Sequence, residues 1–248
     1  MSPRLAPRLS NKRESGPADG FGGEAGNVRQ LELGLPRRAP LYDRAHFLVT
    51  ESNRSAMLAA SRFFETGETL LCISGPAQSG KTHLLHVLAE EHGGTVVGGR
   101  NLPPTITERA VIGVDDAHAA DPEALLSLLA AARACGGRFL VAGAGDPSAW
   151  ARGQRDLASR LGAAPCVTLS EPDEGLLVAV IGKHFADRQL RVRPEVARFA
   201  APRLAKTFAA AAEFVNALDA LALAERSELS VKLANRVLAN LSEAPPAT

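Results

Sequence analysis

The chain has 248 residues, with 28 Lys and Arg against 27 Asp and Glu, which gives a formal net charge of +1 at pH 7. This balance requires neither a nucleic-acid nor a membrane partner, and 4% aromatic residues are too few to favour a base-stacking platform for single strands. No apolar run approaches the ~20 residues of a membrane span. Because Cys72, Cys135 and Cys166 are odd in number and widely spaced, we expect them to be buried free thiols in a cytoplasmic protein.

The N-terminal part contains an alternating apolar ladder. Residues 1–27 are rich in Pro, Gly, Ser and Arg, and we expect them to form a disordered tail. In the following segment, 28–40, the side chains of Leu31, Leu33 and Leu35 after Gln30 would all point to one side of an extended chain. Such a ladder favours docking on a partner; the alternative is an edge strand added to the chain's own domain.

A phosphate-binding loop is predicted at residues 75–82, G-P-A-Q-S-G-K-T, which fit the pattern G-x-x-x-x-G-K-[ST]. Gly75 and Gly80 allow a tight turn that points backbone N–H groups at phosphate oxygens. Lys81 would place a positive charge on the β- and γ-phosphates, and the Thr82 hydroxyl would ligate Mg²⁺. We therefore expect the cofactor to contact Gly75, Pro76, Ala77, Gln78, Ser79, Gly80, Lys81, Thr82 and His83.

The elements around this loop support the prediction. Residues 69–74 read as a buried strand, and residues 81–91 read as a helix whose N-terminus favours anions. The alternative is a Gly/Ser loop that matches the pattern by chance. His83, His86 and Glu90 share one face of that helix, but no further ligand set with metal spacing appears, so we do not predict a metal site there. A helix is also expected over 55–64, capped by Ser52 or Asn53.

Two carboxylates follow an apolar strand predicted at 110–114. Asp115 would hold Mg²⁺ through water, and Asp116 would orient or deprotonate an attacking water. The alternative is a turn with a helix cap, although Asp121 is better placed to cap the helix expected at 122–133. The pair gains its meaning from the phosphate loop upstream.

The remaining pattern predicts an α/β domain with a parallel sheet, followed by a small all-helical lid. Further strands are expected at 95–97, 138–142 and 165–169, with a short helical piece at 156–161. Beyond residue 171 only helical periods occur, at 172–186, 194–203, 207–225 and 230–241. The expected organisation is a tail (1–27), a peptide and linker (28–40), a nucleotide-binding α/β domain (41–170), a helical lid (171–241) and a second tail (242–248).

A strand, phosphate loop and helix followed by a helical lid resemble the AAA+ P-loop arrangement. The finer resemblance, over residues 28–241, is to the DnaA initiator branch and within it to the Hda-type regulators that inactivate DnaA. Residues 47–54 are similar to the motif that opens the nucleotide domain beside the adenine, and residues 75–82 and 114–116 resemble the Walker A and Walker B motifs. Residues 156–161 resemble the motif that carries the arginine finger, and the ladder at 30–35 lies where these regulators carry a clamp-binding peptide.

The resemblance implies ligands, partners and roles for single residues. The nucleotide would be ADP or ATP with Mg²⁺, and Arg160 would be a finger acting in trans on a neighbour's nucleotide. Gln30 with Leu31, Leu33 and Leu35 would dock on the DNA polymerase sliding clamp. The partners would be a DnaA-type initiator and the clamp, with DNA reached through the clamp, a homodimer as an option and no membrane contact. For Arg160 the alternative is a surface ion pair with Asp156, four residues earlier.

The chain departs from that branch at two places. Residues 142–145, Ala-Gly-Ala-Gly, stand where a polar "sensor 1" group would position water, and Ala209 stands where the lid's "sensor 2" arginine would. Arg203 and Lys206 are the nearest cationic residues but are off the pattern. Because losing groups around the transferring phosphate costs orders of magnitude in rate, we expect slow or absent hydrolysis by the chain itself.

Three functions follow as hypotheses. The first is an adaptor, associated with the replisome, that promotes ATP hydrolysis by the DnaA initiator and so represses new rounds of replication. The second is a DnaA-like binding module that triggers no hydrolysis. The third is an autonomous P-loop ATPase such as a helicase loader.

Overall fold

In a computed structural model of the chain, the structure describes residue 42 and residues 44–106 and 110–243. The expected N-terminal tail and the ladder from Gln30 to Leu35 lie outside the described residues. So does the end of the expected C-terminal tail, although its first two residues belong to the last helix, which ends at Glu243. No helix among the described residues is long and apolar enough to cross a bilayer.

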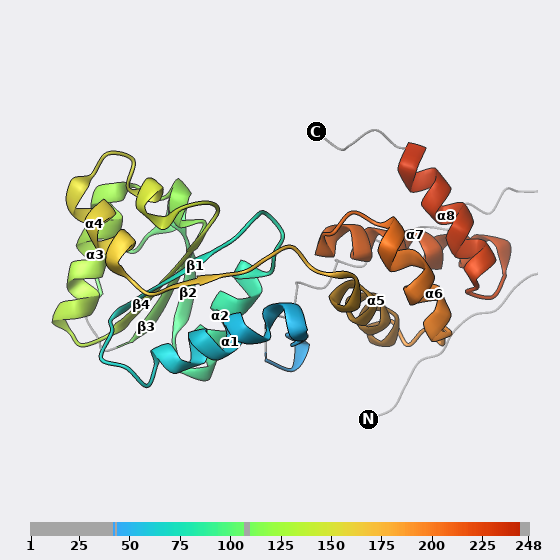
Figure 1. Cartoon of the computed structure of the whole chain (residues 1–248), viewed down its shortest axis with the longest axis horizontal. Helices are drawn as coiled ribbons and strands as arrows, with labels where there is room; N and C mark the ends of the chain where they lie inside the picture. Colours follow the sequence, from blue (N-terminus) through green and yellow to red (C-terminus); the bar gives the residue numbers. More distant parts are fainter. Residues whose placement is uncertain (1–41, 43, 107–109, 244–248) are drawn as a thin grey trace, which may run out of the picture. The chain divides into compact units, whose positions relative to one another are not determined.

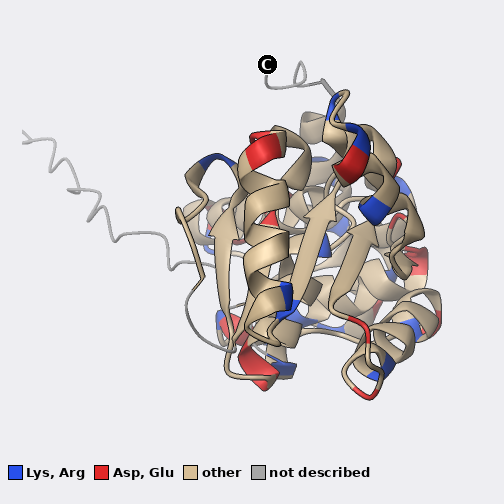
Figure 2. Ribbon diagram, turned by 90° about the vertical axis from the view of Figure 1, so that its left-hand side faces the viewer, with Lys and Arg blue, Asp and Glu red and all other residues tan. Residues whose placement is uncertain are grey.

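A five-stranded sheet forms the centre of the α/β part. The strands are β1 (Leu70–Ser74), β2 (Thr95–Gly98), β3 (Val111–Asp115), β4 (Arg138–Gly143) and β5 (Cys166–Thr168), in the order β2-β3-β4-β1-β5 with every neighbouring pair parallel. All five residues of β1 are buried, as expected for a parallel strand covered on both faces. Figure 2 shows the strands almost wholly in the colour of uncharged residues.

Helices cover both faces of this sheet (Figure 1). One face packs on α1 (Glu51–Phe63) and α2 (Lys81–Glu91), in a core that joins Leu71 and Ile73 of β1 to Leu84 and Leu88. The other face packs on α3 (Pro122–Ala134) and α4 (Arg155–Ala163) through a second core. Alternate residues of each strand therefore point into different cores, as the pleat requires.

The helical lid has a core of its own. Its helices are α5 (Glu174–Asp187), α6 (Pro194–Ala200), α7 (Phe208–Glu225) and α8 (Val231–Glu243). They share one cluster of buried side chains that includes Phe185, Phe214 and Leu218. Asp173 and Thr207 cap two of these helices, accepting from the backbone N–H groups of Leu176 at 2.7 Å and Ala210 at 3.1 Å.

Short 3₁₀ turns connect several elements: η1 (Arg44–His46), η2 (Gly99–Asn101), η3 (Ala117–Ala119), η4 (Pro147–Ala151) and η5 (Ala201–Arg203). The parallel sheet and the four helical periods of the lid are thus confirmed, and η5 completes the predicted period at 194–203. The domain limits at residues 40, 170 and 241 stay predictions.

Two local predictions are wrong. Helix α1 begins at Glu51 with Thr50 as its N-cap, not at residue 55, because the Asn53 side chain accepts from the Thr50 N–H and donates to the Leu48 carbonyl, both at 2.8 Å. Of the three thiols only Cys72 is buried, whereas Cys135 is half-buried and Cys166 is exposed. Cys166 lies on β5, at the edge of the sheet, where fewer elements cover the strand.

Candidate nucleotide-binding site

The predicted phosphate loop lies at the carboxyl end of β1 and leads into α2. A Cβ built on Gly75 would come within 2.4 Å of the Leu169 carbonyl oxygen and 2.9 Å of Ser79 Oγ, so no side chain fits there. Gly80 has φ +92, which an L side chain rarely adopts. Both glycines are therefore required by the observed backbone, as their places in the motif predict.

The interior of the loop holds polar groups that suit an anion. Lys81 is only 9% exposed, and its ammonium donates to the Pro76 carbonyl at 2.5 Å. Burial lowers the pKa of Lys81, against the opposing effect of Asp115 and Asp116. In the described part of the chain, Ser79 Oγ is the buried side-chain oxygen or nitrogen that has no hydrogen-bond partner. A phosphate oxygen would supply an acceptor to both groups.

The candidate Mg²⁺ ligands are brought together. The Thr82 hydroxyl donates to Asp115 Oδ2 at 2.8 Å, which joins the start of α2 to the end of β3. Hydroxyl and carboxylate oxygens are the hard ligands that Mg²⁺ prefers, and the ion usually keeps several waters, through one of which Asp115 would hold it. These two residues therefore fit the ion. No group of three or more His, Cys, Asp or Glu within residues 44–106 and 110–243 could hold a metal by itself.

Asp116 occupies a strained position next to this pair. Its φ of 50 places it in the left-handed region, which costs a non-glycine residue about 1 kcal/mol. Its backbone N–H donates to Asp115 Oδ1 at 3.0 Å, and its side chain is exposed. The role of Asp116 toward a water molecule stays a prediction. Asp121 caps α3, accepting from Ala124 N at 2.9 Å, so the end of β3 does not need Asp116 as a helix cap.

Aromatic rings gather where the adenine is expected. The Phe47 and His83 rings meet edge to face at 5.1 Å, and Tyr42 meets His83 in the same way at 5.5 Å. Tyr42 also stacks on His86 at 4.8 Å. The sequence did not lead us to expect Tyr42 at this site. His86 was considered only as a metal ligand, and no metal site was predicted there. Tyr42 is the single tyrosine of the chain, and its place just before the 47–54 motif was the available signal.

Within the stretch expected to hold sensor 1, residues 142–145, Gly143 has no room for a side chain. Gly143 ends β4, and a Cβ added to it would lie 2.8 Å from the Trp150 ring. Trp150 is held there because its indole N–H donates to the Ala144 carbonyl at 2.6 Å. Ala142 is fully buried in the core, on the same strand. A packed indole, which was not predicted, thus lies beside Gly143, whereas Ala144 and Gly145 are exposed.

The lid offers no arginine at the expected sensor 2 position. Ala209 is the second residue of α7. Arg203 is held within the lid, where it donates to the Phe199 carbonyl at 2.7 Å and lies 4.0 Å from the centre of the Phe199 ring. Lys206 is exposed, just ahead of α7.

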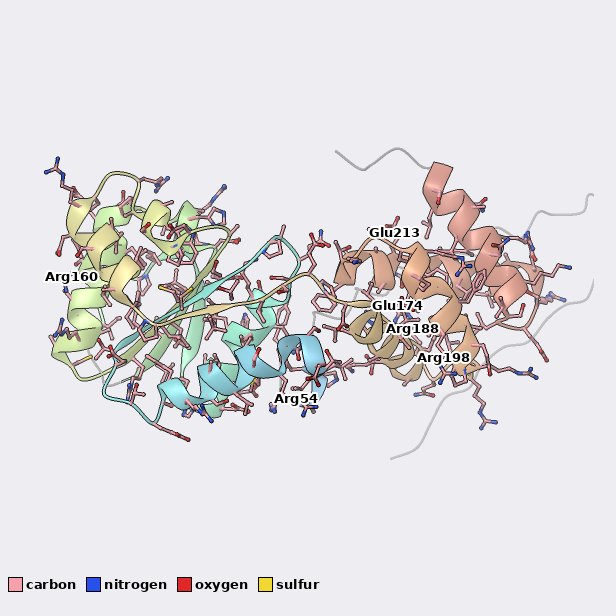
Figure 3. All side chains as sticks on the ribbon, in the orientation of Figure 1. Arg54, Arg160, Glu174, Arg188, Arg198 and Glu213 are labelled. Carbon is pink, nitrogen blue, oxygen red and sulfur yellow. The ribbon has the colours of Figure 1, made fainter. Side chains whose placement is uncertain are left out.

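Arg160 lies on α4, away from the chain's own loop. Because α4 ends three residues before β5 begins and the sheet is parallel, the end of α4 is near the edge where the strands start. The phosphate loop follows the other end of β1. Figure 3 shows Arg160 at the side of the α/β part opposite to the loop between β1 and α2. Its guanidinium donates twice to Asp156, at 3.1 Å each, which is the ion pair considered as the alternative.

Comparisons with known proteins identify the fold. No protein-family model matches the chain, and no curated protein matches it in sequence. Among solved structures, domain III of the Thermotoga maritima replication initiation protein DnaA matches with a TM-score of 0.68 and 18% identity, over 83% of this chain and 99% of that one. The Thermotoga maritima RuvB Holliday junction branch migration motor matches with a TM-score of 0.63 and 19% identity, over 81% and 72%.

A third match is a replication initiator DnaA bound to AMPPCP and single-stranded DNA, with a TM-score of 0.59 and 17% identity, over 76% of this chain and 69% of that one. Together with the parallel sheet and its covering helices, these matches show that the chain has the AAA+ fold.

Proposed function

We propose that the protein is a nucleotide-binding adaptor of replication initiation that promotes ATP hydrolysis by a DnaA-type initiator. The observation that carries the proposal is the contrast between the two ends of one AAA+ unit. The end with the phosphate loop has groups to hold a nucleotide but no polar side chain in residues 142–145, where Trp150 packs on Gly143, and the opposite end presents a guanidinium.

Binding of an adenine nucleotide is supported by the site itself. Lys81 and Ser79 offer donors in the loop, and Thr82 with Asp115 offers adjacent oxygens for Mg²⁺. Tyr42 and Phe47 place rings beside His83, where a purine would lie. When bound, Mg²⁺ would neutralise phosphate charge. The described initiator structure that contains AMPPCP shares this fold. The nucleotide would serve mainly to hold the loop and its surroundings in one shape.

Action on another protein's nucleotide is supported by the placement of Arg160. Its ion pair with Asp156 is an exposed i,i+4 pair, with side chains 37% and 56% accessible. Such pairs contribute only about 0.3–0.5 kcal/mol, so a neighbour's phosphates would displace the carboxylate readily. A guanidinium supplied in trans raises phosphoryl-transfer rates by about 10³–10⁵.

The sliding clamp would concentrate the adaptor at replicating DNA. Docking through Gln30, Leu31, Leu33 and Leu35 remains a proposal from the sequence. A tether of this kind raises the effective concentration of Arg160 near the initiator without adding contacts at the reacting phosphate.

The test measures ATP hydrolysis by a DnaA-type initiator in the presence of DNA-loaded clamp. The native chain should stimulate it, Arg160→Ala should lose about 10³-fold of that stimulation, and Arg155→Ala, an exposed arginine on the same helix, should retain it. Asp156→Ala should also retain it, because the finger would then be unpaired. Full stimulation by Arg160→Ala would remove the proposed role. A separate clamp pull-down with Gln30→Ala tests the tether.

A second function is favoured by the observed Arg160–Asp156 pair. If that pair persists in the assembly, the protein would be a DnaA-like module that binds the initiator without triggering hydrolysis. An unchanged nucleotide state of the initiator after complex formation would support this reading. The third hypothesis, an autonomous ATPase or helicase loader, requires substantial turnover by the purified chain, and the packed Trp150 argues against it.

A further inference from the structure

The lid carries its charge unevenly. Residues 188–206 contain six cationic side chains and one acidic one, Glu195, a formal charge of 6 − 1 = +5, in a chain whose total is +1. Helix α7 (Phe208–Glu225) contains three acidic residues and no basic one. We name the cationic set the α6 arginine surface: Arg188, Arg191, Arg193, Arg198, Arg203 and Lys206.

Five of these six cations are exposed, Arg188 is half-buried, and none pairs with a carboxylate in the described part of the chain. Helix α6 buries Val196, Ala197 and Ala200, which leaves Arg198 facing solvent. Arg191 and Arg193, just ahead of the helix, are exposed as well. No ion pair within residues 44–106 and 110–243 involves any of the six cations, whereas other cations of the lid are paired, as Lys183 is with Asp187 at 2.9 Å.

Two of the cations are held in fixed positions. Arg188 donates to the His184 carbonyl at 2.9 Å and to the Asn216 side chain. Arg203 is stacked on Phe199 and bonded to its carbonyl. Arg188 directly follows α5 and Arg198 lies on α6, and these two helices pack against each other (Figure 3).

The chemistry of the surface selects among polyanions. The exposed large apolar side chains of the described chain are Val49, Leu58, Leu223 and Val231. None of them lies within residues 188–206, so this segment presents no large apolar side chain that would insert into a bilayer. Arg203 covers one face of the Phe199 ring, and Phe199 is itself half-buried, which disfavours stacking of a single-stranded base on it. Guanidinium groups match phosphate oxygens in a planar, two-point geometry.

We propose that the α6 arginine surface binds the phosphate backbone of duplex DNA directly and without sequence preference. The contact goes beyond the proposed function, in which DNA is reached through the clamp. Backbone contacts of this kind hold a protein on DNA through release of counterions and carry no base recognition. The lid would thus keep the protein on DNA near its partner.

The test measures binding of the full chain to a fluorescent duplex by anisotropy, without clamp or initiator, between about 50 and 200 mM salt. The test variant combines Arg191→Gln, Arg193→Gln and Arg198→Gln, three exposed residues for which no side-chain hydrogen bond is observed. The control variant combines Arg62→Gln, Arg133→Gln and Lys232→Gln, which are exposed elsewhere. Melting temperatures of both should equal that of the native chain.

The test variant should bind about tenfold or more weakly than the native chain at the lower salt concentration, and its slope of log affinity against log salt should be smaller by about 3. The control should keep most of the affinity. Failure of the native chain to bind duplex would overturn the proposal, as would an unchanged slope in the test variant, which would assign binding to another part such as the N-terminal arginines. Binding to vesicles of anionic phospholipid in place of duplex would equally overturn it. None of these results depends on Arg160 or on ATP hydrolysis by the initiator. Failure of the duplex-binding test can therefore be distinguished from failure of the proposed function.

Discussion

The Thr82 hydroxyl and the Asp115 carboxylate are joined by a hydrogen bond of 2.8 Å across 33 positions of the chain. The bond ties the first turn of α2 to the end of β3 and sets two candidate Mg²⁺ ligands side by side. The nucleotide site is therefore assembled from two elements that are far apart in the sequence and pack against each other in the fold.

Asp115→Asn should weaken nucleotide binding by about 10–100-fold when Mg²⁺ is present. The amide keeps an acceptor for Thr82 but loses the charge that favours the cation. Binding of a fluorescent adenine nucleotide, titrated with Mg²⁺ and again with EDTA, measures this. Glu123→Gln, an exposed residue on α3, is the control. Equal losses with and without Mg²⁺ would contradict a role at the metal.

Gly75→Ala should abolish nucleotide binding and lower the free energy of unfolding by about 1–3 kcal/mol. The new methyl group would lie 2.4 Å from the Leu169 carbonyl, a backbone atom that cannot move without disturbing the end of β5. Gly67→Ala is the matched control, since nothing lies within 4 Å of its Cβ. Denaturant unfolding and nucleotide titration check both. Normal nucleotide affinity in Gly75→Ala would show that the observed loop is not the binding conformation.

Gly143→Ala should also destabilise the protein by about 1–3 kcal/mol, because the Trp150 ring occupies the space of the new methyl. The loss should shrink when Trp150→Leu is added, since a smaller side chain relieves the overlap. Gly182→Ala, in α5 with nothing within 4 Å of its Cβ, should raise stability by about 0.5–1 kcal/mol. Chemical denaturation of the four variants tests this coupling. Additive effects of the Gly143 and Trp150 changes would refute it.

Alkylation of the folded protein should modify Cys135 and Cys166 but leave Cys72 unreacted. Burial raises the pKa of Cys72 to about 12, with a smaller contribution from Cys166, so its thiolate is scarce and shielded. Burial also raises the pKa of Cys166, which should slow its labelling relative to a fully solvated cysteine thiol. Peptide mass analysis after timed labelling distinguishes the three.

The sign of the Cys72 effect on stability follows. Folding favours the neutral thiol of Cys72, which therefore contributes to the free energy of unfolding. This contribution is complete at pH values below the ordinary thiol pKa of 9.0 and is lost as the pH rises towards about 12. Rapid modification of Cys72 under native conditions would mean that the strand β1 opens to solvent.

The local pattern of residues was enough to locate the phosphate loop, the five strands and the helices of the lid. These depend on neighbours within a few positions, such as the glycines at 75 and 80, the apolar run at 70–73 and the cap at Asp121. The start of α1 was misplaced because Asn53, which was interpreted as a possible N-cap, instead lies inside the helix and supports Thr50 as the cap.

Contacts between distant elements were decided only by the tertiary structure. Whether Trp150 fills the space beside Gly143, whether Tyr42 stacks on His86 and whether Cys166 meets solvent depend on how separate strands and helices pack. The same holds for the α6 arginine surface: its cations can be read along the chain, but the exposure of Arg198 follows from the burial of the opposite side of α6. Packing is set by all elements together, and no short window of the sequence contains that information.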